Sequence, residues 1–212
     1  VNNANDAVGL IQTAEGAMTE THSMLQRMKT LTTQAANGTY TKTARDNIQA
    51  EVDALNKEIT RIASTTKFNG ETPLSPAKKG QNLTFFIGAT ADKTNAMTVA
   101  QLTMTAAALT IDKIKVSTTT DAFKAMASVD AAIERVSTYR ATLGAAQNRL
   151  EHTVNNLKVT SENITSAESR IRDTDMADEI TAYTKNNILL QAAQSMLSQS
   201  NAMPQGVLSM LQ

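Results

Sequence analysis

The chain contains no cysteine and no tryptophan, and aromatic residues make up only 3% of its 212 residues. Without cysteine, the protein can form no disulfide framework, thiol nucleophile or cysteine-ligated metal site. Few aromatic side chains are available to fill the thick core of a compact enzyme. The composition therefore favours thin cores between long helices over a globular catalyst.

An excess of charge of one sign is also missing, because 20 Lys and Arg residues balance 20 Asp and Glu residues. A chain with no net charge exerts no long-range attraction on phosphate backbones, so a nucleic-acid partner is not expected. A run of about 18 apolar residues, which a membrane span needs, does not occur. The two histidines match no metal-binding or catalytic pattern. We therefore expect no enzymatic activity, no metal, no cofactor and no membrane partner.

Heptad repeats are what the chain has instead, and they predict long helices that pack along apolar seams. Residues 1 to about 37 form the first predicted helix, and Asn37-Gly38 is a typical helix end. Its apolar side chains recur every seven residues, at Ile11, Met18 and Leu25, with a companion seam at Ala14, Met28 and Ala35.

A second helix is predicted from about Thr43 to Thr65, and the turn Phe68-Asn69-Gly70 follows it. Its apolar residues are spaced four, three, four and three apart, as in a coiled coil. These predicted core residues are Ile48, Val52, Leu55, Ile59 and Ile62.

The longest repeat lies in the C-terminal half and predicts a single long helix. Its main seam has an apolar residue at every seventh position and ends at Ile171. A companion seam contains Met126 and Ile133, is polar at Arg140 and Gln147, and is apolar again at Val154. The predicted core residues of this helix are Val129, Val136, Leu143, Leu150, Leu157 and Ile164.

Residues 71 to about 117 differ from the rest, because prolines and turn-forming residues forbid a helix at Pro73 and Pro76. Leu83–Gly88 and Met97–Met104 are predicted to be paired strands, and Ile111–Val116 is a third strand candidate. We therefore expect a mainly α-helical protein, an elongated rod of long antiparallel coiled-coil helices with a small β-hairpin in the middle of the chain.

The last segment is predicted to be a fourth helix, capped by Asp173 or Thr174 and running from about Asp175 to Gln199. Pro204 is predicted to interrupt it, and an apolar tail, Val207-Leu208-Ser209-Met210-Leu211, follows. An exposed apolar end needs a partner to cover it.

Short motifs at both ends of the chain make it similar to bacterial flagellin, over nearly all residues and least between about 71 and 120. In the N-terminal part these are Ile11-Gln12-Thr13-Ala14-Glu15-Gly16-Ala17, Leu25-Gln26-Arg27-Met28 and Gln34-Ala35-Ala36-Asn37-Gly38. In the C-terminal part they are Leu143-Gly144-Ala145-Ala146-Gln147-Asn148-Arg149, Thr153-Val154-Asn155-Asn156-Leu157 and Ser169-Arg170-Ile171-Arg172-Asp173. Leu150-Glu151-His152-Thr153 resembles flagellins of Gram-positive bacteria.

The resemblance implies a structural subunit that polymerises into the flagellar filament for motility. It divides the chain into outer-tube helices at 1–70, a central β-like region at 71–120, the long outer-tube helix at 121–174 and an inner-tube helix at 175–212. It also implies that the family's N-terminal inner-tube segment is absent, which leaves the last helix without its coiled-coil mate. That helix is then expected to be disordered, or ordered only by a partner.

The resemblance further implies partners: other copies of the subunit, an export chaperone, a flagellar assembly factor, and the hook-associated and cap proteins. The subunit would be cytoplasmic before export and extracellular afterwards. The residues expected to contact the chaperone or the inner-tube helix are Ile180, Ile188, Leu189, Ala193, Met196, Leu197, Val207, Leu208 and Leu211.

Flagellins are also recognised by a Toll-like innate immune receptor of animal hosts. By motif, the resemblance assigns this receptor patch to Gln26, Arg27 and Leu31 of the first helix and Glu51 of the second. Two alternatives to a filament subunit remain open from the sequence. One is a hook–filament junction protein, and the other is the helical signalling hairpin of a chemoreceptor.

Overall fold

The computed structural model describes residues 1–75, 82–88 and 92–210, apart from the side chains of residues 93, 203–205 and 207–210. It divides into two units, Val1–Val159 and Thr160–Gln212. The elements in chain order are α1 (Asn2–Ala36), α2 (Lys42–Thr65), β1 (Asn82–Phe86), the 3-10 turn η1 (Lys93–Asn95), β2 (Ala96–Ala100), α3 (Thr119–Arg172) and α4 (Met176–Met210). The fold is therefore mainly α-helical with a two-stranded antiparallel sheet, as predicted.

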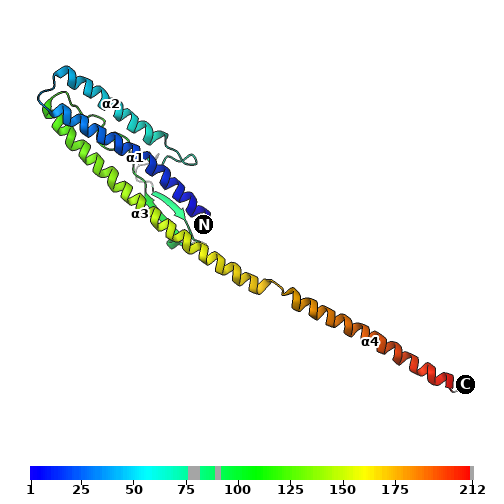
Figure 1. Ribbon diagram of the computed structural model, residues 1–212. Helices are drawn as coiled ribbons and strands as arrows, with labels where there is room; N and C mark the ends of the chain where they lie inside the picture. The colour runs from blue at the N-terminus through cyan, green and yellow to red at the C-terminus, as the bar shows by residue number, and fades with distance from the viewer. Residues whose placement is uncertain (76–81, 89–91, 211–212) are drawn as a thin grey trace. The chain divides into compact units, whose positions relative to one another are not determined.

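In the first unit, α1, α2 and the first part of α3 pack together around one apolar core (Figure 1). Two ion pairs join α1 to α3: Lys29 Nζ lies 2.8 Å from Asp130 Oδ1, and Arg140 Nη2 lies 3.4 Å from Glu15 Oε1. Residue numbers fall along α1 as they rise along α3, so these helices are antiparallel. The short connection between α1 and α2 makes that pair antiparallel as well.

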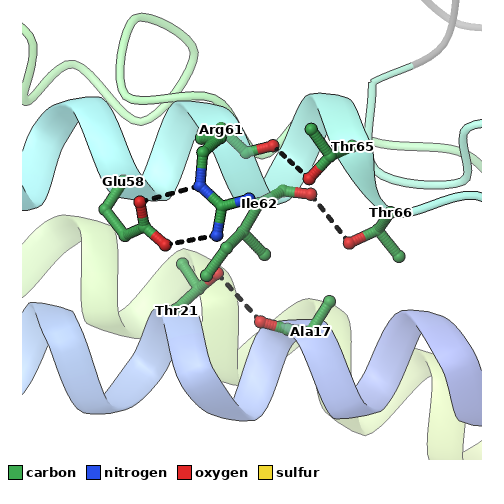
Figure 2. A network of polar contacts seen from close by, with 7 residues as sticks. All are labelled: Ala17, Thr21, Glu58, Arg61, Ile62, Thr65 and Thr66. Carbon is green, nitrogen blue, oxygen red and sulfur yellow. Dashed lines mark hydrogen bonds and ion pairs between the residues drawn. The ribbon is translucent and has the colours of Figure 1, made fainter.

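The buried stripe of α1 follows the predicted heptads almost without a break. Its members lie three or four residues apart, except for the adjacent pairs Leu10-Ile11 and Leu31-Thr32, which keeps them on one face of the helix. Thr21 lies in this stripe, and its hydroxyl donates to the carbonyl of Ala17 at 3.0 Å, so no polar group is left unpaired (Figure 2). The stripe consists of Ala4, Ala7, Leu10, Ile11, Ala14, Met18, Thr21, Leu25, Met28, Leu31, Thr32 and Ala35.

Side chains cap the connection from α1 to α2. Arg45 donates from Nε to the carbonyl of Ala35 and from Nη2 to that of Asn37, which satisfies the C-terminal end of α1. The hydroxyl of Thr41 accepts from the amide of Ala44 and caps the start of α2. The end of α1 and the start of α2 are therefore both fixed by side chains that lie close to them in the sequence.

The predicted seam of α2 is only partly correct. Ile48, Val52 and Ile59 are buried, whereas Leu55 and Ile62 are only partly buried. Asn56 and Ala63 take the buried positions beside them. The buried face of α2 is therefore shifted by about one residue from the predicted seam. The reason is that a loop distant in sequence, which contains Ile111, packs over Asn56. A heptad pattern within α2 does not predict this contact.

The exposed side of α2 carries its charges. Glu58 accepts from both Nε and Nη2 of Arg61, at 2.8 and 2.6 Å, in the fork shown in Figure 2. The hydroxyls of Thr65 and Thr66 donate to the carbonyls of Arg61 and Ile62 at the end of the helix. These local bonds hold the last turn together before the chain leaves α2.

The turn after α2 is the predicted Asn-Gly turn. Asn69 and Gly70 both have positive φ, 50° and 87°. Phe68 and Glu71 exchange two backbone hydrogen bonds across it, at 2.9 and 3.0 Å. This two-residue geometry is the one that Asn-Gly favours.

The predicted hairpin is present, and the third strand is not. β1 and β2 pair in antiparallel register, with Leu83 opposite Val99 and Phe85 opposite Met97, so one apolar face is formed. Met97 and Val99 are buried. The prediction of a strand at Ile111–Val116 is wrong, because this segment forms turns and irregular backbone instead.

Residues 101–118 form a loop that α2 and α3 hold through side chains. Gln49 of α2 bonds this loop twice, from Nε2 to the carbonyl of Ile114 and at Oε1 from the amide of Val116. Buried Asn56 donates from Nδ2 to the carbonyl of Ile111 at 2.8 Å. Arg135 of α3 donates to the carbonyl of Ala108. These bonds take the place of the ladder that a third strand would have made.

The main seam of α3 is buried as predicted from Val129 to Leu150. As far as Ala146 its companion seam is on the other flank from the one predicted, because Ala132, Tyr139 and Ala146 are buried while Ile133 and Arg140 are only partly so. The predicted companion residue Val154 is buried. The small side chains of Ala132 and Ala146 allow the helices to approach closely. Alanine is only weakly hydrophobic, so a seam that contains it is hard to recognise from the sequence.

The predicted core does not continue to the end of α3. Val154 is its last buried residue, Leu157 is partly exposed and Ile164 is 63% exposed. The prediction that Ile164 belongs to the core is therefore wrong for this chain. The physical reason is that an apolar seam is buried only where a second surface covers it, and a heptad repeat does not by itself provide that surface.

The second unit contains the last residues of α3 and all of α4. Asp175, one residue beyond the predicted caps, accepts from the amide of Ala177 at 2.9 Å and caps α4. The backbone is helical through Pro204 to Met210, so the predicted interruption is wrong. A proline inside a helix removes one hydrogen bond and need not end it. Pro76, Leu211 and the side chains of Val207 and Leu208 lie outside the part of the chain that the structure describes.

Candidate functional site: two exposed surfaces

The first candidate surface lies where α1 and α2 face solvent together. Arg27 Nε donates to Glu51 Oε1 at 2.7 Å, and the two side chains are 54% and 43% exposed. Arg27 points outward because its neighbours in the buried stripe are Leu25 and Met28. The hydrogen bond from Arg27 and its attraction to the Glu51 carboxylate raise the pKa of the guanidinium further, so it stays charged. The pair is therefore an accessible site that carries both charges.

The structure brings together three of the four residues assigned to the receptor patch. Gln26 is exposed, and its Nε2 lies 2.9 Å from Nε2 of His22 on the next turn. Leu31 is only 2% exposed, so the assignment of this residue to an accessible surface is wrong for this chain. Its position in the heptad of α1 places it in the core between helices. The exposed patch is therefore Gln26, Arg27 and Glu51.

Two further charged pairs of α1 were not predicted from the sequence. Lys29–Asp130 and Glu15–Arg140 join α1 to α3, as described above. Charges that flank an apolar seam commonly pair between helices of a coiled coil. This position beside the seams was the signal that could have revealed both pairs.

The second candidate surface is α4. Every residue that was predicted to contact the chaperone or the inner-tube helix, and whose side chain the structure describes, is exposed, and the large ones are more than half exposed. The exposed fractions are 56% for Ile180, 62% for Ile188, 56% for Leu189, 72% for Met196 and 63% for Leu197. Isolated exposed apolar residues are ordinary, but a whole helix of them is not.

The apolar residues of α4 are spread around the helix. Ile188, Leu189 and Leu190 are consecutive, so they point in three directions about 100° apart. A helix that is apolar in several directions is usually buried on several sides. One coiled-coil mate would therefore cover only part of α4, and full burial needs several neighbours or a partner that wraps around it.

Neither surface resembles an active site. Among the residues that the structure describes, no group of three His, Asp or Glu side chains is placed to hold a metal ion. No helix within those residues is long and apolar enough to cross a bilayer.

Comparison with known proteins gives the family. Residues 1–79 match the family model of the bacterial flagellin N-terminal helical region, and residues 126–211 match that of the C-terminal helical region. A flagellin of Bacillus subtilis (strain 168) is 45% identical over 240 residues, which cover 99% of this chain and 79% of the relative. A flagellin of Halalkalibacterium halodurans is 41% identical over 209 residues, covering 99% and 76%. The chain is thus of the Gram-positive flagellin type.

Solved structures agree. The crystal structure of Bacillus cereus flagellin matches with a TM-score of 0.64 and 30% identity, over 78% of this chain and 94% of that one. This family match favours a filament subunit over the junction protein and the chemoreceptor hairpin. The chain belongs to the bacterial flagellin family, and it is a structural subunit, not an enzyme, that polymerises with copies of itself into the extracellular flagellar filament.

Proposed function

We propose that α4 is the segment of this flagellin that a chaperone binds before assembly and that packs against neighbouring subunits afterwards. Before assembly, in the cytoplasm, an export chaperone covers α4 by wrapping around it. In the filament, the helices of neighbouring subunits take the place of the chaperone and form the inner tube. The observation that supports this proposal is the exposure of large apolar side chains in several directions around α4.

The exposed surface of α4 is unfavourable in water. Burying a Leu, Ile or Met side chain gains about 1.5–3 kcal/mol, so covering five of them provides a large driving force for association. Part of this gain offsets the cost of ordering the helix, which is marginally stable alone. Docking of an amphipathic or apolar helix into a groove is a common mode of recognition.

Substitutions in α4 test the proposal. In the full chain, Leu189→Asp combined with Met196→Asp is expected to weaken binding to the purified export chaperone at least tenfold, measured by calorimetry. The matched control is Ser198→Asp, which adds a charge at an exposed polar position. The melting midpoint of the first unit is expected to be unchanged. Equal chaperone affinity of the double variant and the control would refute the role of α4.

Other partners of the segment follow from the same exposure. The flagellar assembly factor would compete with the chaperone for free subunits. The hook-associated and cap proteins would contact the subunit at the two ends of the growing filament. Competition between assembly factor and chaperone for the wild-type chain, and its loss in the Leu189→Asp, Met196→Asp variant, checks the first of these proposals.

A second proposed function concerns the patch of Gln26, Arg27 and Glu51. The exposed ion pair between Arg27 and Glu51 supports its recognition by a Toll-like receptor, because it presents accessible charges on two neighbouring helices. Arg27→Ala is expected to reduce signalling in a receptor-reporter assay. The control is Lys42→Ala, which removes another exposed ion pair, with Asp46, outside the patch. Unchanged signalling by Arg27→Ala would contradict the assignment.

A further inference from the structure

A cavity of about 320 Å³ lies between α3 and the loop that follows the hairpin. Its walls include Leu102, Met104 and Leu109 from the loop and Glu134, Thr138 and Tyr139 from α3. Met104, Leu109 and Tyr139 are buried, whereas Leu102 is 47% exposed. The cavity is thus an apolar pocket with an accessible rim.

Hydrogen bonds hold the walls of the pocket and satisfy part of its polar lining. Arg135 Nη1 donates to the carbonyl of Ala108 at 2.9 Å and ties the loop to α3. The hydroxyl of Thr142, another lining residue, already donates to the carbonyl of Thr138 at 3.0 Å. The pocket therefore offers mainly apolar surface, which suits one large apolar side chain better than a polar ligand.

Phe123 is an unpartnered side chain of that kind. It lies near the start of α3 and is 62% exposed, the largest exposed fraction among the large apolar side chains described in residues 1–159. The chain has only four Phe and three Tyr residues, and Phe123 is one of those whose side chains are exposed. Exposed aromatic residues that fill a pocket of a partner commonly dominate binding energy.

Phe123 cannot reach the pocket of its own chain. It lies 15 residues before Thr138 on the same helix, or about 22 Å along the axis at 1.5 Å per residue. It also lies roughly 90° away from the mean direction of the pocket residues of α3. The side chain and the pocket therefore lie on different faces of the same molecule.

We infer that Phe123 of one subunit inserts into this pocket of a neighbouring subunit. Two complementary surfaces on different faces form a heterologous contact, which repeats into an open assembly rather than closing into a dimer. This is the kind of contact that a filament subunit needs. Neighbouring copies with parallel α3 helices are then offset along the axis by about 22 Å.

One opposite-charge pair is available across the contact, although Arg135 also lines the pocket. Lys124 follows Phe123, and Glu134 lines the pocket; both side chains are exposed. Neither forms an ion pair with any residue that the structure describes. Insertion of Phe123 brings Lys124 of one copy to the rim that carries Glu134 of the next, so the contact also has a specific orientation. The inference does not depend on the roles proposed for α4 or for the receptor patch.

Polymerisation of the full-length flagellin tests the contact. Phe123→Ala is expected to raise the critical concentration for filament formation about tenfold, whereas Phe123→Leu, which keeps an apolar side chain, raises it less than about threefold. The melting midpoint of both monomers is expected to equal that of the wild type. Lys124→Glu is expected to weaken polymerisation, and adding Glu134→Lys is expected to restore it.

Crosslinking tests the geometry independently, because the chain has no cysteine of its own. With Lys124→Cys and Thr138→Cys in one chain, the two thiols are about 21 Å apart along α3, beyond the reach of a short bismaleimide. Polymerised protein is expected to give a ladder of covalent multimers, and each single variant at most a dimer. Wild-type critical concentration for Phe123→Ala, or the absence of a ladder, would overturn the inference.

Discussion

Single buried polar side chains hold the loop that covers the core. Asn56 is 7% exposed, and its Nδ2 donates to the carbonyl of Ile111 at 2.8 Å. Without it, that carbonyl would keep only a long contact of 3.5 Å from the amide of Ile114. A buried carbonyl that loses its donor costs far more than the bond itself contributes net.

Asn56→Ala is therefore expected to lower the free energy of unfolding by about 1–3 kcal/mol. Chemical denaturation of the monomer measures this change. Lys57→Ala, at the exposed neighbouring position, is the control and is expected to change stability by less than about 0.5 kcal/mol. Equal stabilities of the two variants would contradict a structural role for the amide of Asn56.

Tyr139 links stability to alkaline pH. Burial raises the pKa of its phenol above the ordinary value of 10.0, and a hydrogen bond with the backbone of Leu102 opposes part of the rise. A raised folded-state pKa means that the stabilising contribution is complete below pH 10 and is lost as pH rises through the folded-state value.

The wild-type protein is therefore expected to lose stability above about pH 10, with a slope of up to about 1.4 kcal/mol per pH unit from this group. Tyr139→Phe removes the titration and shifts stability by a constant amount at all pH values. The difference between the two curves of unfolding free energy should thus change above pH 10. Parallel curves would show that burial does not perturb the phenol.

At the scale of the element, α3 is one continuous heptad pattern with two different environments. Leu150 is fully buried, whereas Ile164, at another position of the same seam, is 63% exposed. The sequence repeats are alike at both positions. What differs is whether another helix packs against the seam.

A matched pair of truncations on α3 tests this difference. Leu150→Ala is expected to cost the monomer about 2–5 kcal/mol, because it leaves a cavity in the core. Ile164→Ala is expected to cost less than about 0.5 kcal/mol. Denaturation of the monomer gives both values, and a comparable cost for Ile164→Ala would mean that its side chain is buried in solution.

At the scale of the whole molecule, stability is concentrated in one unit. All buried side chains that the structure describes lie in residues 1–159, and none lies in residues 160–202. Segments with few buried contacts open locally at low cost and exchange or are cleaved first.

Limited digestion of the monomer with trypsin is therefore expected to begin at Arg170, Arg172 or Lys185 and to leave a resistant N-terminal fragment. Mass spectrometry of early products identifies the sites. The same positions are expected to be protected once the chaperone is bound or the filament has formed. First cleavage within α1 or α2 of the monomer would contradict this distribution of stability.

Features that depend on near neighbours in the chain were predictable from the sequence. Heptad spacing predicted three of the four long helices closely, because helix periodicity is a local property. Asn69-Gly70 predicted its turn for the same reason, since the two residues adopt positive φ at low cost. The motifs at the two ends also identified the family before any fold was known.

Only the tertiary structure decided which side of each helix is buried and where burial ends. It placed Leu31 in the core, chose Ala132 and Tyr139 over Ile133 as the companion seam of α3, and left Ile164 exposed. Each of these outcomes depends on a packing partner distant in sequence, such as the loop bound by Asn56 and Gln49. A repeat determines that an apolar seam exists, but burial is a property of two surfaces, and the second surface is brought to the seam only by folding.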